Sequence, residues 1–287
     1  MKRSITNSIF AGIAATAFAG GAFADGMPGG SMKDAPKAAE GRTFAYSWNL
    51  GVTSDYIFRG ISQNRRDPAA QGGVDITYGI FYAGIWGSDV NFGRNNDGSA
   101  VANVEVDIYA GIKPVLGPVT FDLGVISYNY LGGKDRGPRF NQVREQDFTE
   151  LKAGASATFI PKLTTGITLF YSPGFQQGQG SVMTVEGTVA YELPAVMKIV
   201  PTIGGTIGGQ FGDAGSINNP YVFANGKDSY TYWNAGLALA IDKLTLDFRY
   251  WDTNIPNTNL ATGTTNFCNQ DLFGCDGRFV ASAKVTF

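Results

Sequence analysis

The sequence predicts an all-β protein: a transmembrane antiparallel up-and-down β-barrel of 12 strands, with short periplasmic turns and longer extracellular loops. Three observations predict this fold. Apolar and polar residues alternate with a period of two along most of the chain, short and long connections alternate between these segments, and an export signal precedes them.

The export signal occupies residues 1–24. Lys2 and Arg3 form its positive part, residues 9–19 are apolar, and Ala22-Phe23-Ala24 is a small-x-small cleavage pattern. The alternative is a membrane-anchoring helix, but the apolar run of about 16 residues, with Thr16 as its one polar member, is shorter than the ~20 that a span needs. We therefore expect cleavage after Ala24, followed by a flexible periplasmic leader at residues 25–42 without periodicity.

From residue 43 onward the period-two pattern predicts strands with two unlike faces. In one clear example, Val104, Val106 and Ile108 share a face, and Glu105 and Asp107 share the other. Division at Gly, Pro, Asn and Asp clusters gives twelve segments, approximately 44–58, 71–79, 81–90, 101–113, 118–131, 147–159, 162–173, 181–192, 202–211, 229–241, 243–252 and 278–287. The segment at 202–211 is started after Pro201 because proline donates no ladder hydrogen bond.

The connections between these segments alternate in length. Tight ones fall near residues 79–80, 113–118, 160–161, 193–198 and 242, and longer polar ones at 59–70, 91–100, 132–146, 174–180, 212–228 and 253–277. Short turns on one side and long loops on the other are typical of an outer-membrane barrel. A soluble β-sandwich has no reason to sort its loops in this way.

The uncharged face of most segments indicates which side meets lipid. A charge at the bilayer midplane costs ~2–4 kcal/mol, so the lipid face must lack Lys and Arg. Six of the segments place all their charges on the opposite face, whereas a lipocalin-like soluble barrel would have its apolar face inside. For residues 81–90 two outer faces remain open, Phe81/Ala83/Ile85 or Tyr82/Trp86/Val90.

Aromatic residues gather at the ends of the segments. They include Tyr56 and Phe58 at the end of the first one, and Tyr78, Tyr128, Tyr130, Phe159, Phe211, Tyr230 and Trp251 elsewhere. We expect aromatic girdles at both membrane interfaces; ordinary β-propensity is the alternative. The alternating last segment ends in Phe287, which is similar to the insertion signal that the assembly machinery of the outer membrane recognises.

The two cysteines, Cys268 and Cys275, lie seven apart in a polar stretch. In an exported protein this spacing predicts a disulfide that closes a small loop, with a free pair as the alternative.

Composition excludes several function classes. Basic and acidic residues number 22 and 24, which argues against a nucleic-acid partner, and histidine is absent. Without histidine there is no Ser–His pair for a barrel phospholipase and no His metal site. The carboxylates Glu105 and Asp107 share a strand face, but a glycosidase does not fit this context. We expect no enzyme, no cofactor and no metal site.

One family resembles the first part of the barrel. Residues 49–63, NLGVTSDYIFRGISQ, resemble the first strand and loop of the TorF family, proteobacterial outer-membrane proteins of unknown function that are classed as porins. Residues 68–75, PAAQGGVD, and 79–90, GIFYAGIWGSDV, continue the resemblance. Beyond them the likeness is one of architecture. The resemblance implies a porin and assigns no transported solute.

The inward face of the barrel carries the candidate site. Its predicted pore-lining residues are charged: Asp55, Arg59, Asp75, Glu105, Asp107, Lys113, Asp122, Glu150, Lys152, Glu186, Asp247 and Arg249. With Glu192, Lys243, Arg278 and Lys284 on the same rows, acidic residues outnumber basic ones nine to seven, which predicts weak or cation-leaning selectivity. Twelve tilted strands leave a bore of roughly 10–12 Å before loops fold in. Asp55 and Arg59 lie on the same predicted face near the outer mouth, where they form either an ion pair or a solute site.

The sequence therefore predicts a channel in the cell outer membrane for passive diffusion of small solutes or ions. Its expected partners are outer-membrane lipid, these solutes, and the assembly machinery through Phe287. A plugged barrel with a structural or interaction role is the alternative, and a soluble periplasmic β-domain is a third.

Overall fold

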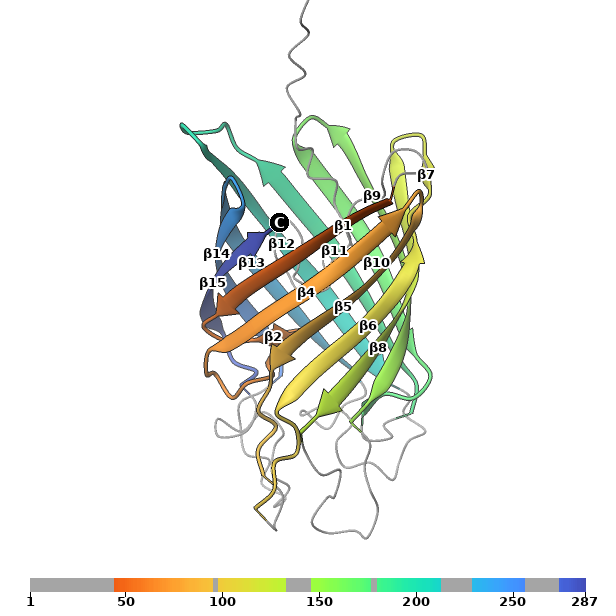
Figure 1. The fold of residues 1–287 in the computed structure, drawn as a ribbon, viewed down its shortest axis with the longest axis vertical. Coiled ribbons are helices and arrows are strands. Elements are labelled where there is room, and N and C mark those ends of the chain that lie inside the picture. Colours follow the sequence, from red (N-terminus) through yellow and green to blue (C-terminus); the bar gives the residue numbers. More distant parts are fainter. Residues whose placement is uncertain (1–43, 95–97, 133–145, 177–179, 213–228, 256–273) are drawn as a thin grey trace, which may run out of the picture.

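The computed structural model describes residues 44–94, 98–132, 146–176, 180–212, 229–255 and 274–287. These residues form a closed wall of 12 antiparallel strands (Figure 1), which confirms the predicted barrel. The wall strands are β1 Phe44–Thr53, β4 Ala69–Tyr78, β5 Phe81–Asp89, β6 Val104–Ile112, β8 Val119–Leu131, β9 Phe148–Ile160, β10 Leu163–Ser172, β11 Val182–Glu192, β12 Ile199–Gly212, β13 Ser229–Ile241, β14 Leu244–Thr253 and β15 Arg278–Thr286.

Three further strands are short: β2 Ile57–Phe58, β3 Ile61–Ser62 and β7 Val115–Leu116. No helix in the described ranges has the length and hydropathy to cross a membrane. The predicted signal peptide at 1–24 and leader at 25–42 lie outside the described residues.

Pairing of the first wall strand with the last closes the ring. β6 pairs with β8, and β1 pairs with both β4 and β15, so the wall has no free edge. Where β1 meets β15, the backbones of Trp48 and Phe287 exchange hydrogen bonds of 3.1 and 2.9 Å, and their rings stack with centroids 4.0 Å apart. Recognition of Phe287 by the assembly machinery stays a prediction.

The connections sort onto two ends. Tight turns, the start of β1 and the end of β15 lie at one end, drawn at the top of Figure 1 and called here the short-turn end; the longer connections lie at the other, the loop end. Lys162 and Asp242 occupy positive φ values of 69° and 54° in two of the tight turns. Such values match the twist of neighbouring strands in two-residue hairpins.

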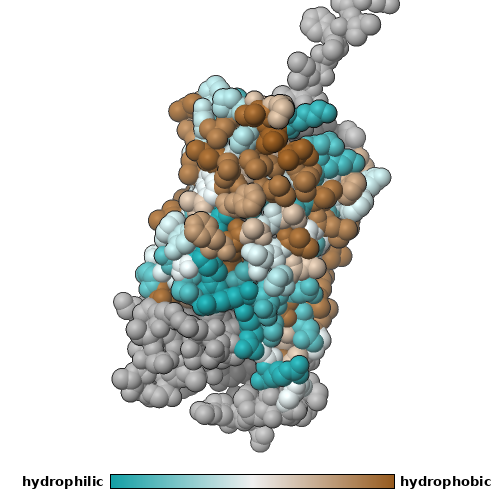
Figure 2. Space-filling view, turned by 90° about the vertical axis from the view of Figure 1, so that its left-hand side faces the viewer, coloured by the Kyte–Doolittle hydropathy of each residue, from teal (hydrophilic) through white to brown (hydrophobic). Residues whose placement is uncertain are grey.

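The outer face of the wall is apolar. On β6, Val104 and Ile108 are 37% and 53% exposed, whereas Glu105 and Asp107 face inward and are 1% and 0% exposed. Figure 2 shows apolar side chains over the upper wall and hydrophilic ones toward the loop end. A continuous exposed apolar surface of this size is costly in water, so it fits the hydrocarbon of a membrane.

The structure also decides the register left open for residues 81–90. Phe81 and Ile85 point outward, and Tyr82 and Trp86 are buried inside. Because this strand contains several small residues, its sequence is compatible with either face pointing outward. The pairing with β4 and β6 selects one of the two.

The first predicted strand, 44–58, is wrong at its end. β1 stops at Thr53, and the following residues turn into the barrel and form the β2–β3 hairpin. The alternating pattern continues through Tyr56 and Phe58 because residues 57 and 58 also form a strand. That strand belongs to the separate hairpin and not to the wall.

The start of the ninth wall strand is also corrected, because Pro201 lies inside β12 and pairs with Leu239. The Pro201 carbonyl accepts a hydrogen bond from the Leu193 backbone N–H, so this edge of the residue faces the end of β11. The missing N–H of Pro201 lies on the same edge, and the pairing with β13 therefore loses no hydrogen bond. The remaining strand boundaries agree with the predicted ones to within three residues.

The aromatic girdles are confirmed only in part. Tyr78, Phe159 and Phe211 lie on the outer surface. Six of the predicted girdle residues are instead buried: Tyr56, Phe58, Tyr128, Tyr130, Tyr230 and Trp251. They lie on the inward rows or in the segment after β1, and four of them contact charged residues described below: Tyr56, Phe58, Tyr128 and Tyr230.

Candidate functional site

The hairpin after β1 crosses the lumen at the loop end. Ile57 pairs with Ser62 and Phe58 with Ile61, so Arg59 and Gly60 form a two-residue turn at φ +50° and +82°. Two positive φ values are the requirement of a type I′ turn, in which Asn-Gly is the usual pair. The turn geometry therefore does not explain why the first turn residue is an arginine.

Gly60 fits the tip of the hairpin against the opposite wall. A Cβ atom at this position would lie 2.4 Å from Thr253 Cγ2 on β14 and 2.9 Å from Tyr232 Cβ on β13. Both the positive φ and this close approach require glycine. The tip is thus seated on the wall and does not project freely into the lumen.

Arg59 forms a buried ion pair with the wall. Its two terminal nitrogens donate to the two carboxylate oxygens of Glu150 on β9, each at 2.8 Å, and both side chains are 1% exposed. Parallel N–H···O bonds of this kind are the strongest arrangement of an arginine and a carboxylate.

Aromatic side chains enclose this ion pair. The Tyr128 hydroxyl donates to Glu150 Oε2 at 3.1 Å, and the guanidinium carbon of Arg59 lies 4.9 Å from the Phe170 ring centroid. On the hairpin itself, the Phe58 ring is 4.6 Å from the same carbon. A guanidinium over aromatic faces gains further electrostatic attraction.

These surroundings keep Arg59 charged. Burial by itself would lower the pKa of the guanidinium, but the Glu150 carboxylate, with smaller effects from Tyr232 and Tyr128, raises that pKa well above its ordinary value. The hairpin therefore carries a permanent positive charge into the lumen.

Further hydrogen bonds hold the tip from other sides. The Tyr56 hydroxyl donates to Glu105 on β6 at 3.1 Å, and the Tyr230 hydroxyl on β13 donates to the Arg59 carbonyl at 3.2 Å. Because β6 and β13 lie on different sides of the ring, the hairpin spans the lumen.

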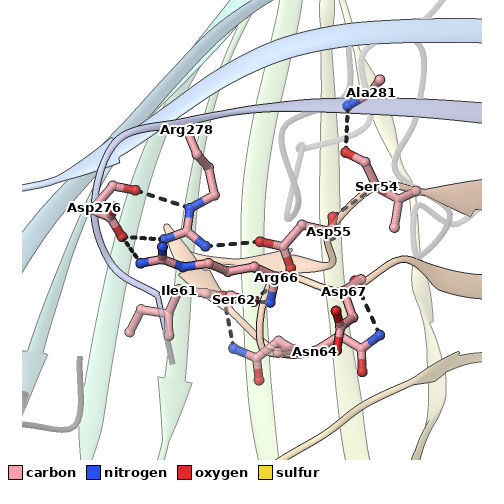
Figure 3. A network of polar contacts seen from close by, with 12 residues as sticks. Ser54, Asp55, Ile61, Ser62, Asn64, Arg66, Asp67, Asp276, Arg278 and Ala281 are labelled. Atoms are coloured by element: carbon pink, nitrogen blue, oxygen red, sulfur yellow. Dashed lines mark hydrogen bonds and ion pairs between the residues drawn. The ribbon is translucent and has the colours of Figure 1, made fainter. Parts of the chain in front are cut away.

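A second network fixes the base of the hairpin (Figure 3). Arg278 on β15 donates to Asp55 at 3.0 Å and to Asp276 at 2.7 Å, and Arg66 also pairs with Asp276. The Ser62 hydroxyl donates to Asp55 at 2.7 Å. Burial raises the pKa of the Asp55 carboxyl, against the opposing effects of the Ser62 hydrogen bond and Arg278.

The short-turn end of the lumen carries separate ion pairs. Asp122 on β8 lies 2.9 Å from Lys152 and 3.7 Å from Lys113, and the Tyr82 hydroxyl donates to it at 2.7 Å. On β14, Arg249 pairs with Asp247 at 3.0 Å. Tyr109 donates to Asp75 at 2.5 Å.

All the predicted pore-lining residues are at most 8% exposed and face the interior: Asp55, Arg59, Asp75, Glu105, Asp107, Lys113, Asp122, Glu150, Lys152, Glu186, Asp247 and Arg249. The structure brings several of them together around the hairpin and around Asp122, whereas Asp247 and Arg249 form a pair of their own on β14. Their role in conduction stays a prediction.

Two expectations about inward residues are wrong. Asp55 and Arg59 do not pair with each other, because the turn at the end of β1 sends them to different wall residues, Arg278 and Glu150. Glu192 does not line the lumen but pairs with Lys162 at the short-turn end, at 3.6 Å, and Lys243 lies exposed there over the Phe287 ring.

The aromatic part of the site was not predicted from the sequence. Tyr128, Tyr230, Tyr232 and Phe170 contact the charged groups, and the Tyr232 hydroxyl donates to Glu186. The Tyr232 ring lies against Gly208, where a Cβ would approach its Cζ to 2.2 Å. The sequence does carry a signal for Tyr128, which shares its alternation row with Asp122 and therefore faces inward and not toward a membrane interface.

Cys275 is 1% exposed and disulfide-bonded. Its predicted partner Cys268 lies outside the described residues. In the part of the chain that the structure describes, no group of three or more acidic or cysteine residues is arranged to hold a metal ion.

Solved structures of membrane barrels are similar to this chain over most of its length. The NanC porin aligns at 15% identity and a TM-score of 0.49, covering 85% of this chain and 99% of its own. LpxR from Salmonella typhimurium aligns at 9% identity and 0.44, covering 84% and 99%, and an OmpT loop-deletion mutant from Vibrio cholerae at 12% and 0.39, covering 85% and 99%.

No curated protein matches the chain. A family model does match, over residues 37–287. This range includes the whole described wall and the inward hairpin. The chain therefore belongs to the Gcw_chp family, bacterial proteins of unknown function.

Proposed function

We propose that the chain is an outer-membrane channel for passive diffusion of small solutes or ions, with a lumen narrowed by residues 54–67. This agrees with the porin role that the TorF resemblance implies, and it assigns no catalytic step to the barrel. The observation that carries the proposal is the division of the wall into an apolar outer face and an inner face lined with charges. A polar inner face behind an apolar outer one is typical of membrane barrels that enclose a channel.

The inner charges favour cations. At the loop end, the inward carboxylates of Glu105, Asp107, Glu150 and Glu186 outnumber the one guanidinium, Arg59, that the hairpin places among them. Rings of carboxylates select cations in channels. We therefore expect small conductance with a cation preference.

A plugged barrel is the second candidate, and one observation favours it. Inward side chains are almost fully buried, including Phe170, Trp86 and Tyr128 at 0% to 1% exposure, and the hairpin contacts several sides of the wall. A lumen filled to this degree conducts only through a narrow path.

Single-channel recording in a planar bilayer tests the proposal. The wild-type chain should give small discrete steps, and Gly60→Ala should enlarge them, because the added Cβ clashes with Thr253 and displaces the hairpin tip. Gly98→Ala is the matched control: Gly98 has a φ of +81° but nothing within 4 Å of its Cβ position. Its conductance should equal that of the wild type.

Heat-modifiable mobility in SDS gels shows whether each variant is folded. Silence of both the wild type and a folded Gly60→Ala variant overturns the channel. Conductance of the variant alone supports a barrel that is plugged at rest.

A further inference from the structure

The groups that hold the Arg59 guanidinium belong to the wall. Glu150 lies on β9, Tyr128 on β8 and Phe170 on β10, so three neighbouring strands form the site and only its occupant comes from the hairpin. If the tip moves away, the carboxylate, the phenol that bonds it and the aromatic ring all remain in place.

We propose that this wall site binds a solute bearing a guanidinium group, and that Arg59 occupies it in the closed state. The inference rests on the proposed channel, since the solute reaches the site through the lumen. It names the substrate class: a small organic cation with a planar, forked set of N–H donors.

The geometry favours a guanidinium over other cations. A fork of two nitrogens matches both oxygens of Glu150 at 2.8 Å, which a point-like ammonium does not reproduce. The Phe170 ring, 4.9 Å from the guanidinium carbon, offers a face to a planar cation and no ligand to a hard metal ion. The site therefore recognises shape as well as charge.

Charge balance requires a cation in this position. Four other lumen cations pair with other carboxylates: Lys113 and Lys152 with Asp122, Arg249 with Asp247, and Arg278 with Asp55. In the described ranges, the ion pair of Glu150 is with Arg59. A buried carboxylate that loses its partner is strongly unfavourable, so departure of the hairpin tip favours entry of a replacement.

Two features of Arg59 oppose its place in the site. Its φ of +50° is one that side-chain-bearing residues rarely adopt, and its Nε is buried with no hydrogen-bond partner in the described part of the chain. The base of the hairpin is anchored independently by Asp55 and Arg278. Exchange therefore requires movement of the tip alone.

Titration calorimetry of the folded full-length mature chain in detergent micelles tests the site. Arg59→Asn empties it while keeping a residue suited to the type I′ turn. This variant should bind methylguanidinium at least tenfold more tightly than methylammonium, and at least tenfold more tightly than the wild type does. Arg59→Asn/Glu150→Gln should lose this binding, whereas Arg59→Asn/Glu192→Gln, which alters a carboxylate at the short-turn end, should retain it.

A folded Arg59→Asn barrel that binds neither probe, or both equally, overturns the inference and leaves Arg59 as a structural lock. If Arg59→Asn does not fold, Gly60→Ala, which displaces the tip by a clash, is titrated in the same way. Binding is measured without conduction, so the two proposals fail separately. A barrel that conducts but does not distinguish the probes overturns only this site, and one that binds methylguanidinium but is silent in the bilayer overturns only the channel.

Discussion

At the short-turn end of the lumen, Asp122 receives Lys152 and Lys113 from the two sides of its own strand β8. At the loop end, Glu150 receives an arginine from a hairpin 91 residues earlier in the chain. The first arrangement is built from wall strands that cannot separate without opening the barrel. The second joins the wall to a segment that can leave it. Ion pairs between wall residues thus support rigidity at one end, and an ion pair with the hairpin supports a removable closure at the other.

The largest expected effect is that of Glu150→Gln. It leaves the Arg59 guanidinium buried without its carboxylate, and breaking such a pair costs about 3–5 kcal/mol. Part of this cost is relieved if the hairpin leaves the lumen, so conductance should rise as the free energy of unfolding falls. Urea unfolding followed by tryptophan fluorescence, together with bilayer recording, measures both.

Glu192→Gln provides the control for that change. The Glu192–Lys162 pair is partly exposed, and exposed pairs contribute only about 0–1 kcal/mol. Equal losses of stability in the two variants would contradict the importance of the hairpin ion pair.

Asp122→Asn should have the next largest effect, but on stability alone. It leaves Lys113 and Lys152 buried without their carboxylate, while the hydrogen bond from the Tyr82 hydroxyl to residue 122 persists. The free energy of unfolding should fall by roughly 2–4 kcal/mol. Conductance should stay at the wild-type level because no contact of the hairpin changes. A rise in conductance as large as the one expected for Glu150→Gln would show that the two ends of the lumen are coupled.

The smallest effect is the pH dependence of Asp55. Burial raises the pKa of this carboxyl above its ordinary value of 3.8, so the folded chain holds the proton more tightly than the unfolded chain does. The stability this contributes is fully present below pH 3.8 and is lost as the pH rises through the raised pKa.

The comparison variant for Asp55 is Asp55→Asn, which does not titrate. As the pH falls from 7, the free energy of unfolding of the wild type should rise relative to that of Asp55→Asn and level off below pH 3.8. Paired unfolding curves between pH 3 and 7 measure this difference. A change of opposite sign would mean that the ion pair with Arg278 outweighs the burial of Asp55.

Much of the wall was predictable, because each strand meets two environments and its side chains must alternate. Val104 and Glu105 show their faces without any knowledge of their neighbours, and all twelve wall strands were found in this way. Tyr128 and Tyr232 were predictable in position but not in role. Alternation places a side chain inside the wall, whereas only the cross-lumen geometry shows which carboxylate it bonds.

Residues 54–63 are the part that no local pattern could place. Tyr56, Phe58 and Arg59 continue the alternation of β1, and nothing in their sequence indicates that the chain leaves the wall at Thr53.

The sequence by itself determined a barrel with an apolar outer face and a charged inner face, because these follow from side-chain period and solvent alone. Only the tertiary structure decided that the first loop enters the lumen and that Arg59 meets Glu150. Such a contact depends on the free energy of burying one particular ion pair between segments distant in sequence, and not on the preference of any single residue for strand or turn.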